Sequence, residues 1–402
     1  MKIFNFNKEK PIEGESIMTK IGNQLKSFNF NGASSINEDS IKRSYTYKGI
    51  GSINGLPTID IYNSTRDWVK FDVGDNFPLY LLDLYITSPI NNAIINNKSN
   101  MIAGKDVIYN DFAETEYEKI TNITLINNMR EVIRKAAFDY TLYGAFALEL
   151  FYNGKILIKI DTISPINLRA KRPKTVYTPI TQWIYSKDFI DTRVEKYEFD
   201  SYIPYKETDK SSVIYYFKSE NAQTDIYGVP SWLSSQKSIL IDGKIADFHN
   251  SNLDNSFSPS THIHFFTSMN QSDTDIQDFA KKLNTSFAGA RNSGKPFITS
   301  SNNADTAIKV DPLTSSDLDK RFESLQTSIT NQILIGHSVT DSELVGVSIP
   351  GKLGTANKQD SYKMFESIVI GPNRKTIEGQ FNKLFVENKI KLQIELTEYN
   401  IF

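Results

Sequence analysis

The chain has 402 residues, of which 39% are hydrophobic, 12% aromatic and 23% charged. These proportions are ordinary for a folded protein of one to three domains, so they argue against wholesale disorder. The formal net charge of −2 arises from 45 basic and 47 acidic residues, so no overall positive field would hold the chain on nucleic acid or on an anionic membrane. There is no cysteine, which excludes disulfides, thiolate metal sites and cysteine nucleophiles.

The N-terminus and the most apolar segments indicate neither export nor membrane insertion. The first ten residues, MKIFNFNKEK, carry charges where a secretory signal needs a continuous apolar segment. The most apolar runs, residues 79–86 and 145–152, are each interrupted by an acid and are far shorter than the roughly 20 residues of a membrane span. We therefore expect a protein that is soluble as made and has no membrane partner.

The N-terminal third combines an irregular segment with helices. Residues 1–76 are rich in Asn, Ser, Lys and Gly and have no sustained hydrophobic period, so we expect a partly mobile N-terminal arm. The apolar spacing that follows predicts two helices meeting at Ser88, because a serine can cap a helix whose first residue is Pro89. A further helix is predicted at about residues 123–143.

A β-rich region follows Gly144. Residues 146–152 and 156–160 predict a hairpin whose turn is Asn153-Gly154, a pair that favours the left-handed conformations of tight hairpin turns. Residues 177–217 alternate aromatic and polar side chains, which predicts several short strands.

Two long helices with a small α/β unit between them are predicted next. The first helix should run from Pro230 to about residue 250, and the second should open at Thr314 or Ser316, each of which precedes an aspartate by three residues in capping-box fashion. Strands at 262–267, 296–300 and 307–310 and a helix at 273–288 should form the unit between them. Apolar residues on one face of the second helix predict its packing surface: Leu318, Phe322, Leu325, Ile329 and Ile333.

The C-terminal region begins with a long loop. Residues 336–358 are polar, contain four glycines and show no helical period, which is typical of a loop retained for function, although a flexible linker is an alternative. A last helix at about 359–387 contains Pro372 after Gly371, so we expect a kink or a split there. An alternating strand at about 391–398 closes the chain.

One segment imitates a nucleotide-binding motif. Residues 289–295 fit the first seven positions of a P-loop, but Pro296 stands where Ser or Thr should hold magnesium. The order of elements is also reversed, because a P-loop leads from a strand into a helix whose N–H groups meet the phosphate. We therefore expect no nucleotide binding.

Familiar metal and catalytic signatures are missing from the sequence. His262 and His264 point to the same face of a predicted strand, but no third ligand lies nearby, so a structural role is favoured. Neither a Gly-x-Ser-x-Gly elbow nor a His-Glu-x-x-His helix is present. We accordingly expect no catalytic residues, no metal site, no cofactor and no enzymatic activity.

Several short segments carry a resemblance when they are taken in order. They are Thr87-Ser88-Pro89-Ile90, Ala103-Gly104-Lys105, Tyr143-Gly144-Ala145-Phe146-Ala147, Tyr227-Gly228-Val229-Pro230, Gly294-Lys295-Pro296-Phe297 and Ile370-Gly371-Pro372. In this order the chain resembles tailed-bacteriophage portal proteins of the HK97-like group over roughly residues 77–398. The Val-Pro-Pro that usually ends the second stem helix is replaced here by Gly336-His337-Ser338-Val339.

The resemblance implies an α+β portal fold with an α/β wing, a two-helix stem, a small α/β clip, a long kinked C-terminal helix and a minimal crown. The implied divisions after the arm are a wing (77–228), a first stem helix (229–256), a clip (257–312), a second stem helix (313–337), a tunnel loop (338–358) and a returning helix with a C-terminal strand (359–402). The crown is expected to be small because little chain follows the returning helix.

The resemblance also implies a function. A portal subunit forms a homo-oligomeric ring, usually of twelve copies, at one capsid vertex, where double-stranded DNA passes during packaging and ejection. Its expected partners are the major capsid protein, the terminase large subunit and a head-tail connector, and its expected location is the virion, after assembly in the host cytoplasm. The terminase would hydrolyse ATP.

The tunnel loop supplies the residues expected to line the DNA channel: Ser348, Lys352, Asn357 and Lys358. A lysine repeated around a ring would present an electropositive collar to the passing phosphate backbone. Two other classes of function remain open. One is an α+β enzyme whose carboxylates form no recognisable motif, and the other is a virion adaptor or scaffold protein without a channel.

Overall fold

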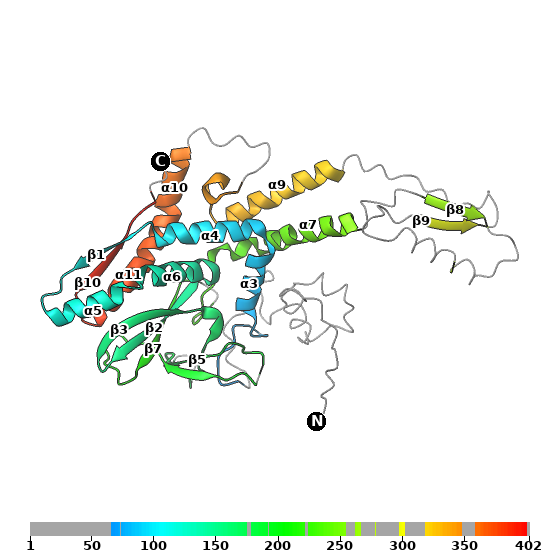
Figure 1. Ribbon diagram of the computed structural model, residues 1–402. Coiled ribbons are helices and arrows are strands. Elements are labelled where there is room, and N and C mark those ends of the chain that lie inside the picture. The colour runs from blue at the N-terminus through cyan, green and yellow to red at the C-terminus, as the bar shows by residue number, and fades with distance from the viewer. Residues whose placement is uncertain are drawn as a thin grey trace, which may run out of the picture. The chain divides into compact units, whose positions relative to one another are not determined.

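The computed structural model describes residues 66–72, 74–174, 178–191, 193–221, 224–254, 262–266, 278, 297–301, 318–347 and 358–399. The chain divides into two units: unit 1 comprises the chain up to Gln236 and again from Leu334, and unit 2 is Lys237–Ile333 (Figure 1). The architecture is mixed α+β, as expected from the sequence. Residues 1–65, the P-loop-like segment and the predicted strand at 307–310 lie outside the described residues.

The first helices of unit 1 form where the sequence places them. α3 (Phe77–Thr87) and α4 (Pro89–Ala103) meet at Ser88, whose hydroxyl accepts a hydrogen bond of 3.1 Å from the backbone N–H of Asn91. A serine cap followed by proline therefore ends one helix and starts the next, which confirms the prediction.

The single helix predicted at 123–143 is wrong in its extent. The structure has α5 (Glu116–Ile126) and α6 (Met129–Tyr143) instead, and α5 opens on a capping box formed by Thr115 and Glu118. The hydrophobic period gives the wrong start for this helix because several large apolar side chains of α5 are exposed, including Tyr117, Ile120 and Ile123. A helix that buries so little of its apolar face lacks the stripe by which helices are recognised.

Two antiparallel sheets complete this half of unit 1. In the first, β2 (Ala145–Asn153) lies between β3 (Ile156–Ile163) and β7 (Ser212–Lys218). The predicted hairpin is confirmed, with Gly154 at φ +61° in its turn. The second sheet has the strand order β4 (Leu168–Ala170), β5 (Gln182–Tyr185) and β6 (Tyr197–Asp200). A 3-10 turn, η1 (Pro165–Asn167), precedes β4. Short strands between 177 and 217 are thus confirmed.

Residues just before α3 belong to this folded unit, although the sequence there shows no periodic pattern. Trp68, Val69 and Phe71 are buried. The backbone N–H of Val69 donates to the carbonyl of Ala170 at 2.9 Å, and Trp68 forms an isolated antiparallel bridge with Lys171. Residues 68 and 69 therefore extend the second sheet next to β4.

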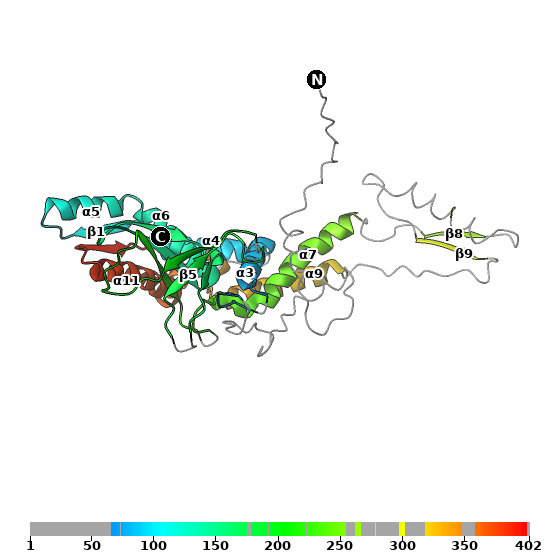
Figure 2. The ribbon, with the colours of Figure 1, turned by 90° about the horizontal axis from the view of Figure 1, so that it is seen from below.

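The C-terminal segment returns to unit 1 as a split helix. A 3-10 turn, η4 (Ser342–Val345), precedes α10 (Lys358–Phe365), which passes through a π-helical turn, η5 (Glu366–Ile370), into α11 (Gly371–Glu387). The irregularity predicted at Gly371-Pro372 is confirmed, because proline has no N–H with which to continue the regular ladder. β10 (Leu392–Leu396) packs on α11 and pairs antiparallel with β1 (Val107–Asp111), a strand that the sequence analysis missed (Figure 2).

Unit 2 contains the predicted pair of long helices and strands between them. α7 (Gln236–Asp254) follows a 3-10 turn in unit 1, η2 (Ser231–Ser235), and α9 (Leu318–Gly336) ends in unit 1. Within unit 2 the hydroxyl of Ser238 on α7 donates to the side-chain oxygen of Gln332 on α9 at 2.7 Å. β8 (His262–Phe266) and β9 (Phe297–Ser301) pair in parallel.

No helix among the described residues combines the length and the apolar character needed to cross a membrane.

Candidate functional site

The residues predicted to pack the second stem helix differ in exposure. Ile329 and Ile333 are buried, with 4% and 0% of their surface accessible, whereas Leu325 is 41% exposed. The side chains of Leu318 and Phe322 lie outside what the structure describes. The face of α9 is therefore covered near residue 333 and open at Leu325.

The end of α9 is built by local backbone geometry. The N–H of Ser338 donates to the carbonyl of Ile335 and the N–H of Val339 to that of Leu334, each at 2.9 Å, while Ser338 has φ +58°. This pattern is a Schellman motif with a serine in the left-handed position. Gly336 lies so close to Ser235 that an added Cβ would be 2.4 Å from the Ser235 Cβ. The end of α9 is therefore tightly packed.

The next residue, His337, is fully buried in unit 1. Its Nε2 lies 2.8 Å from Oδ1 of Asn91, and its ring stacks on Trp232 with centroids 5.7 Å apart. Burial lowers the pKa of His337 well below its usual value, so the imidazole is neutral. Because the amide of Asn91 donates to the carbonyl of Leu84, its oxygen is the acceptor and Nε2 carries the proton. This histidine packs and orients the segment after α9.

A buried lysine contacts the same segment. The Nζ of Lys98 on α4 donates to the backbone carbonyl of His337 at 3.1 Å, where a cation is favourable because the last carbonyls of a helix carry partial negative charge. Only 5% of Lys98 is exposed, and this burial lowers the pKa of its ammonium to about 8. Lys98 therefore holds the backbone at the end of α9.

The two ends of segment 348–357 lie together on unit 1. Lys358 pairs with Glu343, and the hydroxyl of Thr340 donates to the carbonyl of Ser361 at 3.2 Å. On α4, the amide of Asn97 donates to the carbonyl of Val345 at 2.9 Å. The described residues on either side of this segment are thus anchored at one place on unit 1, which we call the loop root (residues 340–347 and 358–361).

Of the four residues predicted to line the channel, the structure describes Lys358 alone. Its side chain is 51% exposed at the start of α10, and the hydrogen bond and charge of Glu343 raise its pKa. Ser348, Lys352 and Asn357 lie outside the described residues. The assignment of all four to a channel stays a prediction.

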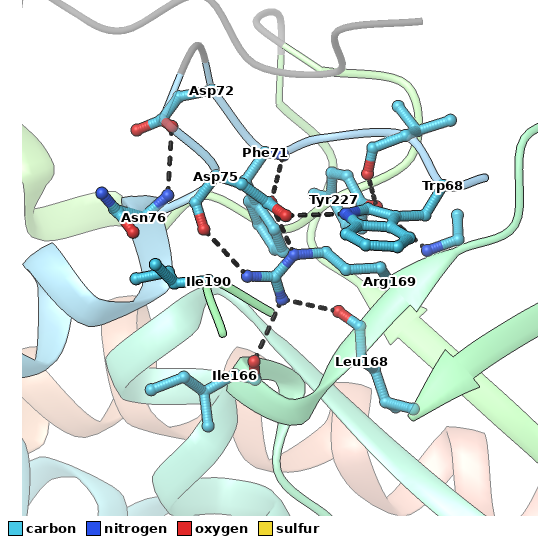
Figure 3. A network of polar contacts seen from close by, with 12 residues as sticks. Trp68, Phe71, Asp72, Asp75, Asn76, Ile166, Leu168, Arg169, Ile190 and Tyr227 are labelled. Carbon is cyan, nitrogen blue, oxygen red and sulfur yellow. Dashed lines mark hydrogen bonds and ion pairs between the residues drawn. The ribbon is translucent and has the colours of Figure 1, made fainter. Parts of the chain in front are cut away.

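A second buried cluster surrounds Arg169 on β4 (Figure 3). Its Nε donates to Oδ1 of Asp75 at 2.7 Å, and the guanidinium also donates to the backbone carbonyls of Asp75, Ile166 and Leu168 at 2.8–3.1 Å. The guanidinium carbon lies 4.8 and 4.4 Å from the ring centroids of Phe71 and Phe189. These contacts combine the hydrogen bonds of the planar guanidinium with cation–π contacts to two aromatic rings.

Asp75 connects this arginine to the segment before α3. Its carboxylate also accepts hydrogen bonds from the indole N–H of Trp68 at 2.7 Å and from the N–H of Phe71 at 3.1 Å. Tyr227 donates its hydroxyl to the carbonyl of Val69 and accepts from the N–H of Ala170 at 3.0 Å. Because the Asp75–Arg169 contacts are internal and buried, we interpret the cluster as structural.

Buried acids in unit 1 have raised pKa values. Burial raises the pKa of Asp72 to about 6 and that of Asp139 to about 8, and it also raises the pKa of Asp83. Among the described residues, none of the three hydrogen bonds to another carboxyl group or to a histidine, and no group of three or more potential metal ligands occurs. Desolvation is the main cause of all three shifts, and at Asp72 the nearby charge of Asp75 adds to it.

Comparison with known proteins gives fold matches. No protein-family model and no curated protein sequence matches the chain. Among solved structures it is similar to a chain in the virion of a native gene transfer agent particle, with 15% identity over 80% of this chain and 84% of that chain and a TM-score of 0.54. It is also similar to a chain in the neck of an empty gene transfer agent particle computed with C6 symmetry, with 16% identity over 80% of this chain and 85% of that chain and a TM-score of 0.54. A third similar chain comes from the neck of a native particle computed with C12 symmetry, with 14% identity over 78% of this chain and 83% of that chain and a TM-score of 0.51. At these identities the likeness establishes the fold.

Proposed function

We propose that this chain is a portal-type subunit that forms a ring in the neck of a phage-like particle. The observation that carries the proposal is the fold likeness, which spans about four fifths of this chain, to chains from particle necks computed with C6 and C12 symmetry. A closed ring of identical copies needs two different surfaces that meet head to tail with a fixed rotation. In this proposal twelve copies assemble in the host cytoplasm and are incorporated into the virion.

Unit 2 supplies the stem and clip in this proposal. α7 and α9 form the stem, and Leu325 packs against a stem helix of the neighbouring copy, since it is 41% exposed on the face where Ile329 and Ile333 are buried. The parallel pair β8–β9 belongs to the clip, which docks the terminase large subunit and later a head-tail connector. Unit 1 forms the wing that meets the major capsid protein.

The loop root supports a channel-lining role for segment 348–357. Both ends of the segment are held on unit 1 by Asn97, Glu343 and Lys358, so the residues between them can project toward DNA from a fixed base. Because Glu343 offsets the charge of Lys358, Lys352 carries more of the proposed electropositive collar. A near-neutral subunit suits a conduit, since many strong phosphate contacts would hold DNA in place.

The protein acts without enzymatic turnover in this proposal, and the terminase supplies ATP hydrolysis. An enzyme of the alternative class would show turnover that disappears when one carboxylate is replaced.

Imaging the purified full chain tests the ring. We expect negative-stain electron microscopy to show rings with a central hole wide enough for a DNA duplex, and light scattering to give the mass of the ring. A monomer that persists at high protein concentration would refute the proposal. Closed oligomers without a hole would favour the adaptor or scaffold alternative.

A packaging experiment tests the channel residues. The double variant Lys352→Glu and Lys358→Glu should leave the ring intact but reduce the DNA packaged per particle, because it reverses the charge that meets the phosphate backbone. Lys363→Glu, at an exposed lysine of α10, is the matched control and should package normally. Normal DNA packaging by the double variant would refute the proposed electropositive collar of Lys352 and Lys358.

A further inference from the structure

Unit 1 contains a cavity of about 70 Å³ that no part of the proposed function uses. Its wall includes Lys98 of α4, Thr141 of α6, Ser219, Ser231 at the start of η2 and Asn373 of α11. Lys98 is buried, Asn373 is half-buried and Ser231 is exposed, so the cavity reaches from the interior to the surface. Ile102, Tyr140 and Gly144 complete the wall, so both polar and apolar groups line the cavity. A cavity of this size holds several waters or one small solute.

Lys98, which lines the cavity, is a buried cation with no ion-pair partner among the described residues. The ammonium of Lys98 has three N–H donors, and its hydrogen bond in the described structure goes to the backbone carbonyl of His337. Burial is the sole cause of its lowered pKa, with no contribution from a carboxylate. At about 8 this pKa still leaves the group mostly protonated at pH 7. A buried charge of this kind is unfavourable unless a ligand or water pairs with it.

Other side chains in the wall of the cavity also carry hydrogen-bond donors. Asn373 uses one amide N–H on the carbonyl of Val369 at 2.6 Å, which leaves its second N–H. Within the described residues, the hydroxyl of Ser231 makes no hydrogen bond. The hydroxyls of Thr141 and Ser219 already donate to backbone carbonyls. The remaining donors are therefore two N–H groups of Lys98, one of Asn373 and the hydroxyl of Ser231.

We propose that this cavity binds a small inorganic oxyanion, with Lys98 as the balancing charge and Asn373 and Ser231 as hydrogen-bond donors. An oxyanion offers acceptors in several directions and suits a cavity whose wall carries donor side chains from three elements, α4, η2 and α11. Its negative charge compensates the ammonium of Lys98, for which the described residues provide no ion-pair partner. The same ammonium holds the carbonyl of His337, so an occupied cavity also stabilises the backbone that follows α9 within unit 1.

The test uses the full chain with inorganic phosphate as the probe. Calorimetric titration at constant ionic strength should give saturable binding, and the midpoint of thermal unfolding should rise with phosphate more than with chloride. Ser231→Asp places a carboxylate at the mouth and should weaken phosphate binding at least about tenfold through charge repulsion. Ser231→Asn has nearly the same shape without the charge and should keep the affinity within about twofold. Both changes are at an exposed residue, so neither disturbs packing.

A second pair of variants isolates the lysine. Lys98→Met should abolish phosphate binding, whereas Lys105→Met, the same change at an exposed lysine, should leave it unchanged. If Lys98→Met does not fold, the comparison of phosphate affinity between Ser231→Asp and Ser231→Asn still tests the proposal. Absence of saturable binding to the unmodified chain, or equal affinities for Ser231→Asp and Ser231→Asn, would overturn the proposal.

Discussion

Replacement of Arg169 by methionine tests whether the buried cluster of Figure 3 holds the segment before α3 in place. The change keeps an apolar stem of similar length but removes the charge. Asp75, whose side chain is 6% exposed, would keep a buried carboxylate without its cation. Breaking a buried ion pair on one side costs about 3–5 kcal/mol, and three backbone carbonyls also lose a charged donor. Because the site can relax, we expect a loss of about 4 kcal/mol in the free energy of unfolding.

Tryptophan fluorescence in a urea titration is the appropriate assay. The three tryptophans of the chain, Trp68, Trp183 and Trp232, all belong to unit 1, so the signal reports that unit. The indole of Trp68 donates directly to Asp75, and its emission should therefore also change when the cluster opens. A loss below about 1 kcal/mol would refute the assigned role, since it would lie within the range of ordinary surface substitutions.

Two further variants sharpen this experiment. Asp75→Asn should also destabilise unit 1, and the double variant should lose less than the sum of the two single losses, because removing both charges leaves neither one unpaired. Arg193→Met is the matched control. Arg193 also pairs with an aspartate, Asp191, but its side chain is 88% exposed, so little change is expected.

The remaining predictions concern α9 and its surroundings. In the unmodified chain the free energy of unfolding should rise by up to about 3 kcal/mol as pH increases from 8 to 10, because buried Lys98 loses its proton near pH 8 while an unfolded lysine keeps it to about 10.5. Urea titrations at several pH values should show that Lys98→Met lacks this rise, and an equal rise in both proteins would contradict the assignment. Ser338→Gly should stabilise unit 1 by about 0.5 kcal/mol, because Ser338 holds φ +58°, which glycine adopts without strain; a lower urea midpoint would contradict this. Ile333→Ala should cost about 3 kcal/mol in the isolated chain, whereas Leu325→Ala should cost far less and instead reduce the fraction of rings seen by electron microscopy.

Signals that lie within a few residues of one another could be predicted from the sequence. Ser88-Pro89 marked a helix junction, Asn153-Gly154 a hairpin turn and Gly371-Pro372 an irregular helix, and the structure has all three. Each depends on a cap, a left-handed turn or a missing N–H, which act over three or four residues. The start of α5 also has a local signal, the capping box of Thr115 and Glu118, but the predicted helix followed the hydrophobic period, which fails where the apolar side chains of α5 are exposed.

Sequence alone therefore determined the mixed α+β class, the order of the main elements and the two long helices that flank β8 and β9. Tertiary structure alone decided which polar residues meet. Asp75 and Arg169 are 94 residues apart, and Asn91 and His337 are 246 apart, so no local pattern could pair them. The same holds for Lys98, which looks like an ordinary polar residue of a helix until the fold buries it beside a cavity. Burial and long-range contact arise when distant segments pack together, and they set the charge balance at these positions.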